Sequence, residues 1–454
     1  MTDTGVQAQP EAVAHSSQTG LARQSLGLLV ASVAGNVAFF VSSLIIARSL
    51  GPSGRGVIAF FIVSVLVGCR LVSVGTAEAT AVACGRHPDR RSAILSQAVS
   101  LSLLLGLVGG ALLAGLLALA RGWLPHDIDG PMIVLIGIGI LANTVFLVAF
   151  GFLRGCARFK AYGGVLALSP WVYAICLAVL WTRSDLTIRS VAVVWVVYSC
   201  ATATASVALS IPVAGLSRLD PRLIRESLRF GVRAWPGSLS SMVNARIDQV
   251  IMGFITTETV LGFYSVAVNV SEILLYLPSA TAAALLPALM RRAAEDRVTE
   301  TLSVFRRLIL VMLAATVVAA AVGAPLIPVV FGHAFSSSVT PYLLLLPSGI
   351  GFAALLVSEA GLLAAGTPVR ASLTMVTAVV TGIVLDFVLV PRLGANGASI
   401  AASAAWLAGG TLGILFLRRR GRLPWSVLVP GRSDVIGVAA TARSTMSSLA
   451  ATRG

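Results

Sequence analysis

The stretch "PMIVLIGIGILANTVFLVAFGFL" (residues 131–153) contains no charged residue and a single amide side chain, Asn143. An α-helix needs about 20 mostly apolar residues to cross a bilayer, so this stretch is long enough to span one. Its GIGILA segment (137–142) matches a dinucleotide-binding loop loosely, but no strand precedes it, and we interpret the glycines as helix-packing residues. The stretch therefore predicts a membrane-spanning helix.

Twelve stretches of this kind follow one another along the chain. They are residues 26–47, 57–79, 95–120, 131–153, 162–181, 190–214, 234–256, 262–288, 304–330, 341–365, 371–391 and 396–417. Only 11% of the 454 residues are charged and 57% are hydrophobic, whereas soluble proteins carry about 25% charged residues. We therefore predict an all-α polytopic membrane protein with twelve transmembrane helices.

Arg and Lys are concentrated in alternate connections between these stretches. If the N-terminus is cytosolic, 25 basic residues fall on the cytosolic side and 6 on the outer side, with Arg70 and Arg246 inside predicted helices. Cytosolic connections of membrane proteins carry an excess of Lys and Arg, so both termini are predicted to be cytosolic, in the cell (plasma or inner) membrane. The net charge of +15 then reflects membrane topology, and no nucleic-acid partner is expected.

A weak internal repeat divides the chain into two halves. "SLGPSGRGVIAF" after the first stretch aligns with "ITTETVLGFYSVA" after the seventh, which places Gly56 opposite Gly262. Two parallel six-helix lobes around a central cavity fit this pattern. The predicted parts are a disordered cytosolic N-terminus (1–24), an N-lobe with helices 1–6 (25–214), a basic amphipathic linker (215–233), a C-lobe with helices 7–12 (234–417) and a basic disordered cytosolic tail (418–454).

Polar residues inside the predicted helices are candidates for a transport site, because a charge at mid-bilayer costs about 2.5–3.5 kcal/mol even on lenient scales. The candidates for substrate binding in the cavity are Arg246, Arg70, Glu272, Asn269 and Asn36, and those for ion coupling are Asp248, Glu359 and Asp386. The arginines suit a cationic cavity that accepts an anionic headgroup. The alternative is an ion pair between Arg246 and Glu272 that holds two helices together. For Asp248, helix pairing and ion coupling are both open.

Features expected of an enzyme do not stand out. "HDIDG" (126–130) has a DxD spacing but falls in a short connection on the predicted outer side, where we interpret it as a surface loop. The five cysteines (Cys69, Cys84, Cys156, Cys176, Cys200) have no CxxC spacing, so neither a disulfide framework nor a metal site is expected. We expect no catalytic residue, no metal and no cofactor, with coupling to H+ or Na+ as an open alternative.

Three stretches carry a family resemblance. "ARSLGPSGRGVIAF" (47–60), "NARIDQVIMGFITTETVLGFYSVAVNVSEIL" (244–274) and "LLAAGTPVRASLTMVTAVVTGIVLDFVLVPRLGANGASIAASAA" (362–405) resemble the polysaccharide flippases of the O-antigen or teichoic type. These belong to the multidrug/oligosaccharidyl-lipid/polysaccharide exporter superfamily. The resemblance implies two six-helix lobes facing a cavity that opens alternately to either side. It also matches Arg246 and Asp248 to an R-x-D-like element of the seventh helix.

The resemblance implies a flippase and not an enzyme. The implied substrate is an undecaprenyl-diphosphate-linked oligosaccharide, moved from the inner to the outer leaflet, with arginines gripping its diphosphate. A lipid II flippase and a cation-coupled multidrug exporter of the same superfamily are the alternatives. The expected partners are the lipid-linked oligosaccharide and the lipid bilayer, with a glycan polymerase and other export machinery as further candidates.

Overall fold

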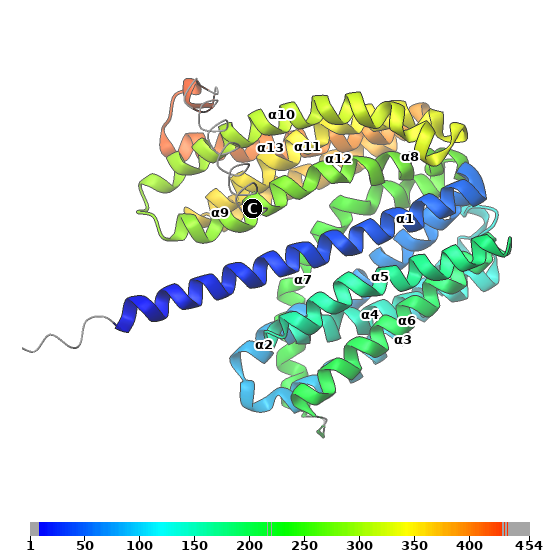
Figure 1. The fold of residues 1–454 in the computed structure, drawn as a ribbon, viewed down its shortest axis with the longest axis horizontal. Helices are drawn as coiled ribbons and strands as arrows, with labels where there is room; N and C mark the ends of the chain where they lie inside the picture. The colour runs from blue at the N-terminus through cyan, green and yellow to red at the C-terminus, as the bar shows by residue number, and fades with distance from the viewer. Residues whose placement is uncertain (1–8, 216, 219, 429–430, 432–433, 435–454) are drawn as a thin grey trace, which may run out of the picture. The chain divides into compact units, whose positions relative to one another are not determined.

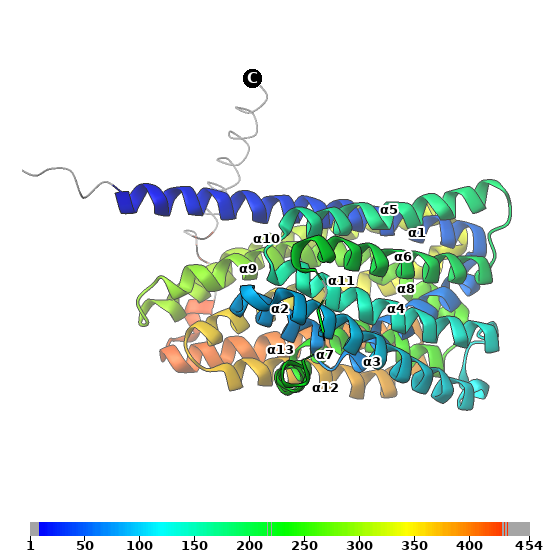
Figure 2. The ribbon, with the colours of Figure 1, turned by 90° about the horizontal axis from the view of Figure 1, so that it is seen from below.

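The computed structural model describes residues 9–215, 217–218, 220–428, 431 and 434. Its helices are α1 (Gln9–Ser73), α2 (Thr76–Arg86), α3 (Arg91–Leu119), α4 (Gly130–Gly155), α5 (Phe159–Thr182), α6 (Ile188–Ala214), α7 (Pro221–Ile255), α8 (Glu258–Ser271), α9 (Tyr276–Met290), α10 (Asp296–Phe331), α11 (Val339–Ala364), α12 (Pro368–Leu393) and α13 (Ala395–Gly421). Short 3-10 segments are η1 (Pro88–Arg90), η2 (Arg121–Trp123), η3 (Glu272–Leu275), η4 (His333–Ser338) and η5 (Trp425–Leu428). The described residues include no β-strand, which confirms the predicted all-α class (Figures 1 and 2).

Ten segments of the described chain are long and apolar enough to cross a membrane. One of them, Val30–Ser73, contains the first two predicted helices, because Gly51 (φ 66°) interrupts the helical backbone of α1 immediately before Pro52. Helix α7 is not among the ten, since its first half is rich in arginine and its second half carries Arg246 and Asp248. All twelve predicted stretches are nevertheless helical, as expected of a multi-pass membrane protein.

Some helix boundaries differ from those predicted. Helix α7 begins at Pro221, so the predicted linker (215–233) and the seventh helix (234–256) are parts of one continuous helix. Leu and Arg, which favour helix, are frequent between Pro221 and the predicted start of the seventh helix. Helix α1 already begins at Gln9, within the predicted N-terminal segment. The rest of that segment and most of the predicted tail lie outside the described residues.

The eighth predicted helix is not one continuous α-helix. It is divided into α8 and α9 by the 3-10 segment η3, which begins at Glu272. Pro278 has no backbone N–H to bond the carbonyl of Leu274, and this missing bond explains why the regular α-helical pattern changes there. A 3-10 stretch inside a longer helix often marks a functional region, and Glu272 is one of the candidate site residues.

The chain forms two compact units. Unit 1 comprises residues 1–50 and 64–239, and unit 2 comprises residues 51–63 and 240–454. Helices α2 to α6 belong to unit 1, where α4 packs against α2, α3 and α6. Helices α8 to α13 belong to unit 2, where α13 packs against α11 and α12. Helices α1 and α7 are each shared between the units along their length.

The repeat-related glycines Gly56 and Gly262 meet inside unit 2. A Cβ added at Gly56 would overlap the carbonyl oxygen of Glu258, and a Cβ at Gly262 would overlap the carbonyl oxygen of Pro52. The contact is therefore reciprocal, with the start of the second part of α1 and the start of α8 packed backbone against backbone. This close approach leaves no room for a side chain at either glycine.

Replacing Gly262 with alanine is expected to destabilise the protein. The added methyl group has no room beside Pro52, and overpacking of this kind typically costs about 1–3 kcal/mol. The control is Gly115→Ala in α3, where no heavy atom lies within 4 Å of the added carbon. Thermal unfolding of the purified protein in detergent should show a lower midpoint for Gly262→Ala and an unchanged or higher one for Gly115→Ala. Equal midpoints for Gly262→Ala and the parent would contradict this packing.

Candidate functional site

Arg246 and Glu272 form an ion pair within unit 2. The Arg246 Nη1 atom lies 2.7 Å from Glu272 Oε1, and the two side chains are 24% and 33% exposed. Arg246 comes from the second half of α7 and Glu272 from the start of η3. Of the two hypotheses for these residues, the structure therefore contains the helix-pairing contact. The Arg246 side chain is not fully buried, and the same contact fixes the position of its guanidinium group.

Asp248 is held by two hydrogen bonds. The hydroxyl of Tyr264 in α8 donates to its Oδ2 atom, and the backbone N–H of Gln249 donates to its Oδ1 atom at 2.7 Å. Tyr264 is fully buried and Gln249 is 4% exposed. Asp248 thus pairs α7 with α8 through Tyr264, a residue that the sequence analysis did not select. A buried tyrosine hydroxyl usually needs a partner, and this requirement is the signal by which Tyr264 could have been found.

Asp386 of α12 is a buried carboxylate in the same unit. Its side chain is 2% exposed, and its Oδ1 atom has no hydrogen-bond partner among the described residues. Asp386 lies close enough to Asp248 and to Tyr264 to interact with both electrostatically. We name Arg246, Asp248, Tyr264, Glu272 and Asp386 the α7 charge cluster. Four elements contribute to it: α7, α8 and η3, which follow one another in the chain, and α12, which is distant in sequence.

The remaining candidate residues lie elsewhere. Arg70 belongs to unit 1, where its Nη1 atom lies 3.5 Å from Glu78 Oε1 of α2 and both side chains are 26% exposed. Asn36 is half-buried in the unit 1 part of α1. Asn269 in α8 and Glu359 in α11 are half-buried in unit 2. The acidic partner of Arg70, Glu78, was also missed by the sequence analysis.

The DxD-like loop has a structural explanation. Asp129 is the N-cap of α4, and its Oδ1 atom accepts a hydrogen bond from the Met132 N–H at 3.0 Å. Arg189, at the start of α6, also pairs with Asp129. The Met132 N–H first, and then Arg189, lower the pKa of Asp129 below its ordinary value. Among the described residues, no group of three or more His, Cys, Asp or Glu side chains is placed to hold a metal ion.

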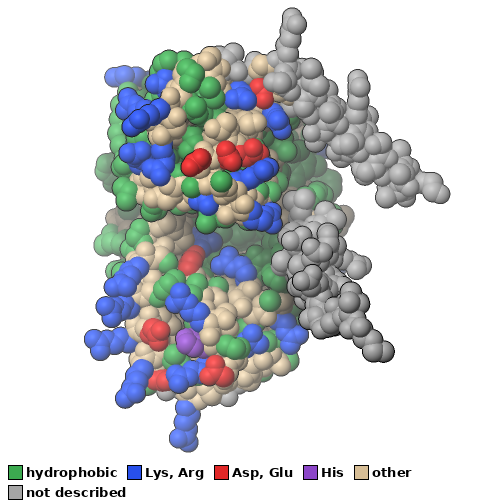
Figure 3. All heavy atoms as spheres, turned by 90° about the vertical axis from the view of Figure 1, so that its left-hand side faces the viewer, with side chains coloured by type: hydrophobic (Ala, Val, Ile, Leu, Met, Phe, Trp, Pro, Cys, Tyr) green, Lys and Arg blue, Asp and Glu red, His purple; other side chains and the backbone are tan. Residues whose placement is uncertain are grey.

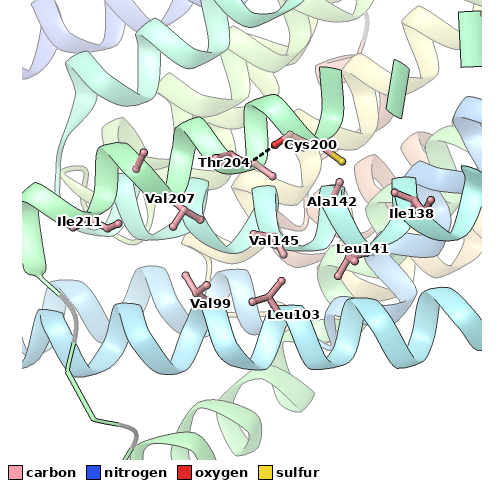
Figure 4. Close-up of a pocket in the computed structure, with 12 residues that line it drawn as sticks. Val99, Leu103, Ile138, Leu141, Ala142, Val145, Cys200, Thr204, Val207 and Ile211 are labelled. Carbon is pink, nitrogen blue, oxygen red and sulfur yellow. Dashed lines mark hydrogen bonds between the residues drawn. The ribbon is translucent and has the colours of Figure 1, made fainter. Parts of the chain in front are cut away.

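An apolar groove of about 410 Å³ lies in unit 1 between α3, α4 and α6 (Figure 4). The residues that line it are Val99, Leu103, Ile138, Leu141, Ala142, Val145, Cys200, Ala203, Thr204, Val207, Ala208 and Ile211. The hydroxyl of Thr204 is already engaged, donating to the Cys200 carbonyl at 2.8 Å. This lining suits a hydrocarbon chain and offers no charge for an anionic headgroup. None of these residues is among the predicted site residues.

Residues 45–340 match the profile of a family described as "Polysaccharide biosynthesis protein". No curated protein matches the sequence significantly. Solved structures do match the fold, at identities too low to indicate more than the fold.

Three of these structures illustrate the range. An inward-facing multidrug resistance MATE family transporter of the MOP superfamily has a TM-score of 0.69 and 14% identity, covering 85% of this chain and 94% of its own. The lipid II flippase MurJ, in an inward closed conformation, has a TM-score of 0.69 and 13% identity, covering 93% and 92%. A MOP superfamily transporter from Pyrococcus furiosus, described as having a binding pocket of reverse polarity, has a TM-score of 0.56 and 14% identity, covering 88% and 95%.

Proposed function

Because the chain belongs to the polysaccharide biosynthesis protein family, we propose that it moves an undecaprenyl-diphosphate-linked oligosaccharide from the inner to the outer leaflet by alternating access. The family and the fold, which also occurs in exporters and in a flippase, support transport rather than catalysis. The proposed partners are this lipid-linked glycan and the bilayer. A glycan polymerase or other export machinery would take up the delivered product.

We propose that Arg246 binds the diphosphate headgroup of the substrate. A guanidinium has five N–H donors in a planar fork that matches the oxygens of a phosphate group. The contact with Glu272 engages Nη1 and leaves other donors of a 24% exposed side chain for a ligand. Glu272 would hold the guanidinium in position in the absence of substrate. A diphosphate, with its concentrated negative charge, would then compete with Glu272 for the same cation.

We propose that Asp248 and Asp386 couple transport to the movement of an ion. Two nearby carboxylates in a buried site repel each other when both are ionised, so a shared proton or a bound cation stabilises the pair. The uncompensated Oδ1 atom of Asp386 supports this role. Tyr264 would position Asp248 from the other side. Either H+ or Na+ fits this arrangement, and the ion would drive the transition between the two orientations.

The two alternatives lead to different chemistry at this site. A lipid II flippase would use the same arginine for a diphosphate and would differ only in the glycan that it accepts. A cation-coupled multidrug exporter would take a drug in place of the lipid-linked glycan. An accessible arginine beside the acidic residues favours an anionic headgroup over a cationic drug.

Deletion of the gene in its own host distinguishes between the proposed glycan flippase, a lipid II flippase and a multidrug exporter. We expect an undecaprenyl-diphosphate-linked oligosaccharide to accumulate in lipid extracts and to stay protected from glycosidase added outside spheroplasts. Accumulation of lipid II would instead support the first alternative. Raised drug sensitivity without any accumulated lipid-linked glycan would support the exporter and contradict the proposal.

The proposed topology, with both termini in the cytosol, is tested by cysteine labelling. Thr257, an exposed residue between α7 and α8, is predicted to face outward. Thr257→Cys should therefore react with an impermeant maleimide on intact cells, above the level of the parent protein. Ser217→Cys, at an exposed position between α6 and α7, is the opposite control and should react only after permeabilisation. The reverse pattern would overturn the orientation.

A further inference from the structure

The first half of α7 carries four arginines on one face. Arg222, Arg225, Arg229 and Arg233 are all exposed, and their spacing of three or four residues places them in one stripe along a helix. Glu226 is exposed beside them, so the face keeps an excess of positive charge. We name these four residues the arginine stripe. They belong to unit 1.

The opposite face of this half-helix is fixed against unit 1. Ser227 accepts a hydrogen bond from Gln97 Nε2 of α3 at 2.7 Å, and the indole N–H of Trp235 donates to the Arg70 carbonyl at 2.9 Å. Between them Gly231 is buried, and a Cβ there would lie 2.6 Å from the carbonyl oxygen of Val74. Ser227, Gly231 and Trp235 are each one turn apart, so these contacts turn the arginine stripe away from the protein.

The place where α3 contacts the first half of α7, at Gln97, indicates how deep this half-helix lies relative to the lipid-facing surface. Exposed apolar residues cover α3 from Leu103 (47% exposed) to Leu119 (87% exposed), as expected of a surface in contact with lipid. Gln97 precedes Leu103 by about 9 Å of helix at 1.5 Å per residue. The first half of α7 crosses α2 and α3 instead of running beside them (Figures 1 and 2). It therefore lies at the level where the lipid-facing surface ends.

The four arginines of the stripe outnumber Glu226, the acidic residue exposed beside them. Within the part of the chain that the structure describes, none of its four guanidinium groups forms an ion pair. Phe230 (37% exposed) and Val232 (53% exposed) flank the stripe with apolar surface. Lys and Arg side chains are exposed across the face of the molecule that Figure 3 shows. Unpaired guanidinium groups beside exposed apolar side chains match the chemistry of the bilayer interface.

We propose that the arginine stripe of α7 binds the headgroups of anionic phospholipids at the membrane surface. Guanidinium groups bind phosphate oxygens bidentately, and an anionic leaflet attracts basic residues placed at its surface. Phe230 and Val232 would enter the apolar boundary beside the headgroups. The bound lipids would hold the first half of α7 against unit 1. This interaction is independent of the glycan that the protein carries, so it stands whether or not the proposed function is correct.

The test measures lipid binding by the purified full-length protein in detergent. Native mass spectrometry with added phosphatidylglycerol or phosphatidylcholine counts the lipids bound to each protein molecule. The variant is Arg225→Gln/Arg229→Gln, and the control with the same charge change is Arg121→Gln/Arg183→Gln, two exposed arginines outside α7. The parent and the control should prefer phosphatidylglycerol, and the α7 variant should bind it about tenfold more weakly.

Several outcomes would overturn the proposal. Equal phosphatidylglycerol binding by the α7 variant and the parent would do so, as would equal binding of the two lipids by the parent. An equal loss in the control would show a general charge effect, and displacement by millimolar inorganic phosphate would indicate a phosphate site instead. Gel filtration checks that each variant is folded. If Arg225→Gln/Arg229→Gln is not, Arg222→Gln/Arg233→Gln provides the same measurement at the ends of the stripe.

Discussion

Arg246→Ala should lower export of the lipid-linked glycan by about 10- to 100-fold while the protein still accumulates in the membrane. Hydrogen bonds to a charged group are worth about 1.5–3 kcal/mol, and each 1.4 kcal/mol corresponds to a factor of ten. The loss should be smaller for Arg246→Lys, which keeps the charge without the planar fork. The measurement is complementation of a deletion strain, with surface glycan quantified per amount of membrane protein.

The ion pair with Glu272 allows the structural and the substrate-binding roles of Arg246 to be separated. The exchange Arg246→Glu/Glu272→Arg restores a pair between α7 and η3 but moves the cation to the other helix. If Arg246 contacts the diphosphate, the exchanged protein should accumulate normally and still fail to export. Recovery of export by the exchange would show that the pair only joins the helices. Glu272→Gln leaves the arginine in place, so it should impair export less than Arg246→Ala.

Asp386→Asn should abolish the response of transport to an ion gradient without lowering stability. The asparagine has nearly the same shape, and it removes a buried carboxylate whose Oδ1 atom has no hydrogen-bond partner among the described residues. An uncompensated charge in a buried site is costly, so its removal is expected to leave the unfolding midpoint unchanged or higher. Transport should nevertheless fall by about tenfold or more, because the neutral amide cannot exchange the coupling ion.

Proteoliposomes containing a lipid-linked glycan, with an imposed pH or Na+ gradient, provide the measurement for Asp386→Asn. The parent protein should be stimulated by one of the two gradients, which also identifies the ion. Tyr264→Phe is the matched control, since it removes the hydrogen bond to Asp248 but keeps both carboxylates. It should retain part of the stimulation. An Asp386→Asn protein that is stimulated like the parent would exclude this residue from coupling.

Several features of the site could be predicted and others could not. Charges inside apolar stretches identified Arg246, Asp248, Glu272 and Asp386, because a membrane helix rarely carries them without a reason. The choice between an Arg246–Glu272 pair and two independent residues could not be made in this way. It depends on how far each helix is rotated about its own axis, and η3 changes that rotation locally at Glu272.

The amino-acid sequence by itself determined that this is an all-α membrane protein and where its twelve helical stretches lie. These properties depend on the summed hydropathy of consecutive residues and on the spacing of residues along the chain. Only the tertiary structure decided that Tyr264 donates to Asp248, that Arg70 pairs with Glu78, and that the arginine stripe faces away from unit 1. The physical reason is that such contacts depend on the packing of distant helices, which hydropathy along the chain does not record.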